Sequence, residues 1–144
     1  MSKPAILIVD DDAVIRTVIA KHLEDEGFAS VQARDGEEGE ALLRERSFPV
    51  ALIDIEMPGI DGLELLRRMR QLSPSTRSVI MSGYVDLSRA MRAMRLGAMT
   101  IVTKPIDKPD LMDAVGRCLD DLAHWKHVLL KVQSLRGHEA EEHA

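Results

Sequence analysis

The chain has 144 residues, enough for one ordinary globular domain with a hydrophobic core and too few for two of typical size. Hydrophobic residues make up 45% and charged residues 30%, which excludes a disordered tail, a collagen-like repeat and a membrane protein. The 19 basic and 24 acidic residues give a formal charge of −5, so bulk charge does not favour nucleic acid.

The chain has a single cysteine, Cys118, which excludes an intramolecular disulfide and a zinc cluster and indicates a reducing compartment. The apolar run Ile6–Val9 near the start is stopped by Asp10–Asp12 and is too short for a signal peptide. No stretch reaches the ~20 apolar residues that a membrane-spanning helix needs. We therefore expect a cytoplasmic protein that does not enter membranes.

Short apolar runs alternate with longer amphipathic stretches along the chain, which is typical of β-α units around a parallel sheet. Ile6–Val9 and Val50–Ile53 are apolar on both faces, so we expect them in the middle of the sheet, where helices cover both sides. The sequence predicts five strands: Ala5–Val9, Ala29–Ala33, Val50–Asp54, Ser78–Ser82 and Thr100–Thr103.

Five helices are predicted after these strands. The first carries an apolar stripe from Val14 to Leu23, and Gly27 lies where a helix C′ residue is expected. Asp35, with Glu38 three residues later, is typical of the capped start of a second helix that runs to about Arg46. The other three are Leu63–Arg70, Val85–Leu96 and a last helix with Pro109 in its first turn.

Charged and hydroxyl side chains stand where four of these strands end. Asp10–Asp12 follow the first strand, Asp54 ends the third, Ser82 ends the fourth and Lys104 follows the fifth. The carboxyl ends of parallel strands converge on one crevice, so we expect these groups to meet there. Converging carboxylates need a proton or a cation, and a few oxygen ligands suit Mg²⁺. An ammonium and a hydroxyl beside them predict phosphoryl transfer to an aspartate.

Five motifs, in the same order and with the same spacing, resemble the receiver domains of bacterial two-component response regulators. The resemblance spans about residues 4–121, and the combination is far more specific than any single motif. The motifs are Ile6–Asp12, Leu52–Gly62, Met81–Tyr84, Leu96–Ala98 and Thr103–Ile106.

This resemblance implies a flavodoxin-like α/β fold: a doubly wound, five-stranded parallel sheet of order 2-1-3-4-5 with five helices. It implies that a sensor histidine kinase or phosphotransfer protein phosphorylates Asp54. By the same resemblance, Asp11 and Asp54 bind Mg²⁺ directly, Asp10 acts largely through a water, and the backbone carbonyl of Glu56 is a further ligand. The resemblance also implies that phosphorylation changes the contacts of this domain with a downstream output protein or domain.

Other roles are also implied by the resemblance. Ser82 and Lys104 would hold the phosphoryl oxygens, and the Lys104–Pro105 bond is expected to be cis. The domain would catalyse only its own phosphorylation and its own slow dephosphorylation, so it is not an enzyme acting on external substrates. The side chains of Glu56 and Tyr84 would flank the approach of the hydrolytic water.

Ile101 departs from the family pattern, because many receivers have an aromatic residue at this place in the fifth strand. We expect Ile101 to pack in or near the core. We therefore do not expect the coupling between the site hydroxyl and an aromatic ring that accompanies phosphorylation in those receivers. Any switch should use another element, such as the fourth helix with Met91 and Met94.

The chain also continues beyond the expected receiver boundary, which we place at residue 121. Residues 122–144 would form a helical extension whose tail frays from Arg136. An apolar seam at 3-4 spacing runs from the end of the receiver into this extension: Val115, Cys118, Leu122, Trp125, Leu129 and Val132. We expect Val115 and Cys118 to pack against the sheet. The remaining seam residues predict a partner helix, hence a homodimer or a signalling linker.

Two alternative functions remain open. Asp54-Ile55-Glu56 faintly resembles the Asp-x-Asp motif of haloacid dehalogenase phosphatases, although the second acid here is Glu and the nucleophile of that family follows the first strand. The chain could also be a phosphorylation-independent scaffold or dimerisation module. No helix-turn-helix follows residue 121, so direct nucleic-acid binding by this chain is not expected.

Overall fold

The computed structural model describes residues 4–83 and 87–142, with side chains through residue 137. Its strands form one parallel sheet in the order β2-β1-β3-β4-β5, which confirms the predicted topology. The strands are β1 (Ala5–Val9), β2 (Ala29–Ala33), β3 (Val50–Asp54), β4 (Arg77–Ser82) and β5 (Thr100–Thr103). The helices are α1 (Ala13–Asp25), α2 (Gly36–Glu45), α3 (Gly62–Leu72), α4 (Leu87–Arg95) and α5 (Lys108–Glu142).

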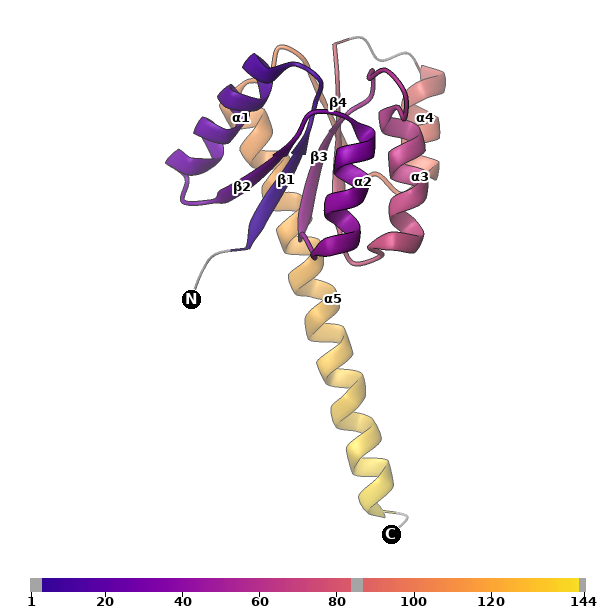
Figure 1. Cartoon of the computed structure of the whole chain (residues 1–144). Coiled ribbons are helices and arrows are strands. Elements are labelled where there is room, and N and C mark those ends of the chain that lie inside the picture. Colours follow the sequence, from indigo (N-terminus) through magenta and orange to yellow (C-terminus); the bar gives the residue numbers. More distant parts are fainter. Residues whose placement is uncertain (1–3, 84–86, 143–144) are drawn as a thin grey trace.

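The helices cover both faces of the sheet. α1 and the first half of α5 lie on one face, and α2, α3 and α4 lie on the other (Figure 1). Successive side chains of a strand point to opposite faces, so Leu7 and Val9 of β1 join one core cluster while Ile6 and Ile8 join the other. β1 and β3 are buried along their whole length, as expected for central strands.

Aspartates begin the first three helices. The side chains of Asp12, Asp35 and Asp61 accept hydrogen bonds from first-turn N–H groups at 2.9, 2.8 and 2.9 Å. Such a cap contributes about 1 kcal/mol to helix stability. All three caps lie at the carboxyl edge of the sheet, so they also fix the loops that leave this edge. Asp12, the last of the three consecutive aspartates, thus serves as the cap of α1.

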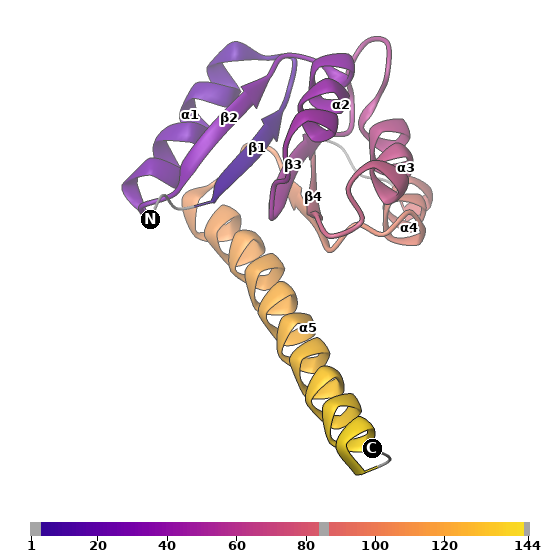
Figure 2. The ribbon, with the colours of Figure 1, turned by 60° about the horizontal axis from the view of Figure 1, so that its bottom comes forward.

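The last helix leaves the domain as a single straight element (Figure 2). Val115 and Cys118 are buried against the sheet, as expected. Near the point of departure, Arg77 of β4 donates a hydrogen bond to the Asp121 carboxylate at 2.6 Å. The helix continues through Glu142, past the predicted start of a frayed tail at Arg136, because this segment contains no proline to end it.

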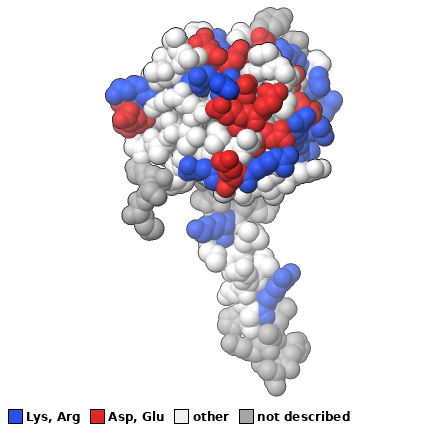
Figure 3. Space-filling model, in the orientation of Figure 1, with Lys and Arg blue, Asp and Glu red and all other residues white. Residues whose placement is uncertain are grey.

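Charge is unevenly distributed over the surface. On the face that carries α2 and α3, acidic side chains gather in the middle and basic ones lie around them, including along the edge where α4 lies (Figure 3). α4 itself contains Arg89, Arg92 and Arg95 and no acidic residue. Within the part of the chain that is described, no helix combines the length and hydropathy needed to span a bilayer.

Candidate functional site

The register of the sheet places the functional strand ends side by side. Val9 pairs with Ile53, so Asp10 and Asp54 end neighbouring strands. Ser82 pairs with Thr103, and the N–H of Lys104 donates to the Ser82 carbonyl at 2.8 Å. The four ends that the sequence singled out therefore meet at one edge of the sheet, as predicted for parallel strands.

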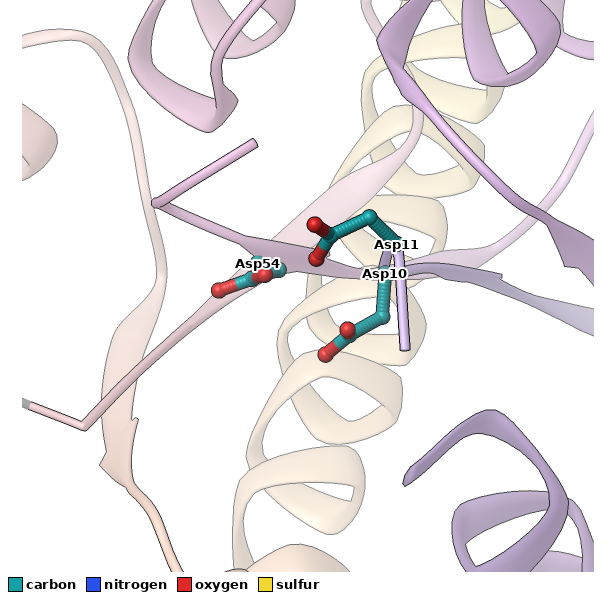
Figure 4. A group of neighbouring side chains, drawn as sticks. All are labelled: Asp10, Asp11 and Asp54. Atoms are coloured by element: carbon teal, nitrogen blue, oxygen red, sulfur yellow. The ribbon is translucent and has the colours of Figure 1, made fainter. Parts of the chain in front are cut away.

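Three carboxylates gather at this edge (Figure 4). One oxygen from each of Asp10, Asp11 and Asp54 lies within 4.8 Å of the other two. Asp10 and Asp54 are buried, whereas Asp11 is exposed. The cluster is thus held by the fold on one side and reached by solvent on the other.

Lys104 contacts two of these carboxylates. Its ammonium Nζ donates to Asp10 Oδ2 at 2.9 Å and lies 3.3 Å from Asp54 Oδ1. The Lys104–Pro105 peptide bond is cis, as the resemblance implies. Burial opposes the charge of Lys104, but the hydrogen bond to Asp10 and the attraction of both aspartates outweigh it, so the pKa of Lys104 is raised.

The surroundings of Asp54 shift the pKa of its carboxyl group. Burial raises the pKa of Asp54 to about 6, and the Asp10 carboxylate adds to this effect. Lys104 and the N–H of Glu56 act in the opposite direction. The three carboxylates of this edge carry more negative charge than one lysine compensates, and a bound cation would offset the remainder.

A glycine that we did not single out holds the loop after Asp54 in place. A Cβ atom on Gly62 would lie 2.3 Å from the Asp54 carbonyl oxygen and 2.7 Å from Ile55 Cα. No larger residue fits where α3 starts against the end of β3. Gly62 is the last residue of the motif Leu52–Gly62, but nothing in the local sequence indicates why a glycine is needed there.

Glu56 contributes its backbone and its side chain in different directions. Its N–H donates to Asp54 Oδ1 at 3.3 Å, while its carboxylate accepts a hydrogen bond from Arg89 of α4 at 2.8 Å. No pattern in the sequence indicates this pair. The carbonyl of Glu56 as a metal ligand stays a prediction.

Two further residues were expected to modulate the site. Tyr84 lies outside the described residues. Ile101 is half-buried and packs against the core on the α2–α4 side, as expected. No aromatic side chain occupies this place in β5.

Comparison with known proteins decides the family. The sequence profile described as "Response regulator receiver domain" matches residues 6–116. The chain belongs to the response regulator receiver family.

Its relatives include both single-domain and longer regulators. Sporulation initiation phosphotransferase F of Bacillus subtilis is 34% identical over 119 residues, which are 83% of this chain and 96% of that protein. The DNA-binding transcriptional regulator NtrC of Salmonella typhimurium is also 34% identical over 119 residues, but the match is 25% of its length. A CheY-like receiver from Methanospirillum hungatei superposes with a TM-score of 0.81 at 32% identity, covering 85% of this receiver and 98% of that chain.

Proposed function

We propose that this receiver is a phosphoacceptor signalling module that takes a phosphoryl group onto Asp54 in a Mg²⁺-dependent reaction. The donor would be a histidine kinase or a phosphotransfer protein, and the result a change in protein–protein contacts. The observation that carries the proposal is the cluster of Asp10, Asp11 and Asp54 oxygens with the Lys104 ammonium bonded to one carboxylate and 3.3 Å from another.

The donor set fits Mg²⁺. Hard carboxylate oxygens are the ligands this ion prefers, and it usually keeps several waters, for which the exposed Asp11 leaves room. Asp10, Asp11 and Asp54 would hold the ion together with the carbonyl of Glu56. When bound, the ion offsets negative charge on the carboxylates and on phosphoryl oxygens.

The transfer itself would be carried out by Asp54 and its neighbours. A carboxylate oxygen of Asp54 attacks phosphorus in line with the leaving group, so a P–O bond forms as the bond to the donor nitrogen or oxygen breaks. Because the pKa of Asp54 is about 6, most of this carboxyl is ionised at neutral pH. Lys104 remains anchored by Asp10 and donates to a phosphoryl oxygen, and the Ser82 hydroxyl donates to another.

The acyl phosphate so formed is open to hydrolysis at the same site. We propose that the receiver slowly removes its own phosphoryl group and turns over no external substrate. Glu56 would flank the path of the attacking water. We propose that the protein acts in the cytoplasm, because its one cysteine is buried as a free thiol and the fold uses no disulfide.

The proposal is tested by intact-mass spectrometry after incubation with Mg²⁺ and acetyl phosphate. We expect one phosphoryl adduct on the parent, and none on Asp54→Asn or in the presence of a chelator. No adduct on a folded, Mg²⁺-binding parent would favour a phosphorylation-independent scaffold. Catalytic turnover of an external phosphoester such as p-nitrophenyl phosphate would favour a phosphatase.

We also propose that a second copy of this chain covers the outer part of the α5 seam. Trp125 and Leu129 are 50% and 60% exposed there. In a parallel pair with Leu122 at heptad position a, Trp125 takes position d and Leu129 the next a, so the two apolar seams face each other. Sedimentation should show a dimer that Leu129→Glu makes monomeric, and a monomeric parent at high concentration would contradict the pairing.

A further inference from the structure

An ion pair joins α4 to the loop that carries the phosphoacceptor. Arg89 Nη1 lies 2.8 Å from Glu56 Oε1, although the two residues are 33 positions apart in the sequence. Glu56 follows Asp54 by two residues, and its N–H donates to the Asp54 carboxylate at 3.3 Å. The negative charge of the Glu56 side chain is therefore balanced by an arginine on a helix outside the aspartate cluster.

The position of the pair gives it access to incoming donors. The Glu56 side chain is 57% exposed and that of Arg89 is 29% exposed, so the pair lies at the surface beside the buried Asp54. Phosphodonors are anions, and an unpaired Glu56 would add a further negative charge to an edge that already carries Asp10, Asp11 and Asp54. Repulsion between an anion and an exposed carboxylate lowers the encounter rate, and salt screens it.

We propose that Arg89 is a positioning residue for phosphorylation: by pairing with Glu56, it removes that carboxylate's charge from the path of anionic phosphodonors to Asp54. The inference deepens the proposed function and rests on it. Arg89 is not a catalytic residue, because it acts on incoming donors only through Glu56.

The same helix supplies a matched control. Arg92 lies one turn after Arg89, is exposed, and forms no ion pair with any residue in the described ranges. Arg89→Ala and Arg92→Ala remove the same formal charge from α4, but only the first leaves Glu56 without this partner. A difference between the two variants therefore isolates the ion pair from the net charge of the protein.

The experiment measures the rate constant for phosphorylation by acetyl phosphate at saturating Mg²⁺ and low ionic strength. We expect Arg89→Ala to be about three- to tenfold slower than the parent and Arg92→Ala to differ by less than about twofold. Glu56→Gln/Arg89→Ala should match the rate of Glu56→Gln alone within about twofold, because the carboxylate that Arg89 pairs with is already gone. Arg89→Lys should keep most of the parent rate.

Two changes of condition separate this role from a merely structural one. The Arg89→Ala defect should shrink as salt is raised. It should also be smaller with phosphoramidate, whose net negative charge is lower than that of acetyl phosphate. Thermal unfolding followed by circular dichroism checks that the variants are folded, and the Glu56→Gln background gives a second measurement of the Arg89 effect.

Equal rates for Arg89→Ala and Arg92→Ala, or a further slowing when Arg89→Ala is added to Glu56→Gln, would overturn the role of Arg89 while leaving a phosphorylated parent and the proposed function intact. Absence of phosphorylation in the parent would overturn the proposed function and this inference with it.

Discussion

The carboxyl edge of the sheet and the outer half of α5 depart from the usual distribution of residues in opposite ways. At the edge, the charged Asp10 and Asp54 are buried; on α5, the apolar Trp125 and Leu129 are exposed. Buried charge and exposed apolar surface are each unfavourable unless something compensates them. Lys104 supplies part of the compensation at the edge, whereas the described residues supply none to the outer α5 seam.

The difference underlies the two roles that we propose. At the edge, clustered carboxylates beside a lysine suit a small cation and an anionic phosphodonor. On α5, exposed apolar side chains at helical spacing suit a second helix. Substitutions confined to one region at a time test the two roles separately.

The largest effect is expected from Lys104→Met at the edge. This variant removes the ammonium bonded to Asp10 and 3.3 Å from Asp54, and we expect phosphorylation by acetyl phosphate to slow about 100- to 1000-fold. Time-resolved intact-mass spectrometry gives the rate. Lys108→Met is the control, because Lys108 pairs with Glu26 and contacts none of the three aspartates. Similar rates for the two variants would remove Lys104 from the mechanism.

Gly62→Ala tests whether the loop beneath the edge depends on close packing. Its Cβ would meet Asp54 backbone at 2.3 Å, so we expect the free energy of unfolding in urea to fall by about 2–3 kcal/mol. Gly116→Ala on α5 meets nothing within 4 Å and should instead raise it by about 0.5–1 kcal/mol. Equal changes in the free energy of unfolding for the two variants would mean that the close packing at Gly62 does not affect stability.

Asp54→Asn tests the burial of charge through pH. Because the folded-state pKa of Asp54 is raised from 3.8 to about 6, its contribution favours folding below pH 4 and is lost as pH rises toward 6. In chelator, the unfolding free energy of Asp54→Asn should therefore exceed that of the parent by about 2 kcal/mol more at pH 7 than at pH 4. A difference that does not change with pH would contradict the raised pKa.

The smallest effect is expected from the fluorescence of Trp125, the only tryptophan. Its side chain is half exposed in the single chain and would become buried in a pair of α5 helices. The emission maximum should shift by a few nanometres to the blue as concentration rises in the parent and stay constant in Leu129→Glu. A shift in both proteins would place its cause outside the seam.

Local patterns in the sequence predicted most of the fold because each is set by neighbours in the chain. Ile6–Val9 is a strand bounded by aspartate, and Asp12 and Asp35 cap the helices that follow them. The aspartate cluster and Lys104 were predictable as well, because parallel strands align their carboxyl ends.

What could not be predicted depends on contacts between distant residues. Arg89 and Glu56 are 33 positions apart, and Arg77 and Asp121 are 44 apart, so no local periodicity contains either pair. The need for glycine at position 62 arises only when α3 packs against the end of β3. The full length of α5 was also missed, because the apolar seam ends at Val132 while the helix continues in polar residues.

Chemical trapping shows directly whether Asp54 carries the phosphoryl group. Borohydride reduces an aspartyl phosphate to homoserine, which changes the mass of the tryptic peptide 47–67 that contains Asp54 and Asp61. After incubation with Mg²⁺ and acetyl phosphate, fragmentation of this peptide should place homoserine at position 54 and leave Asp61 unmodified. Trapped homoserine at another position, or none in a protein that carries a phosphoryl adduct, would contradict the account.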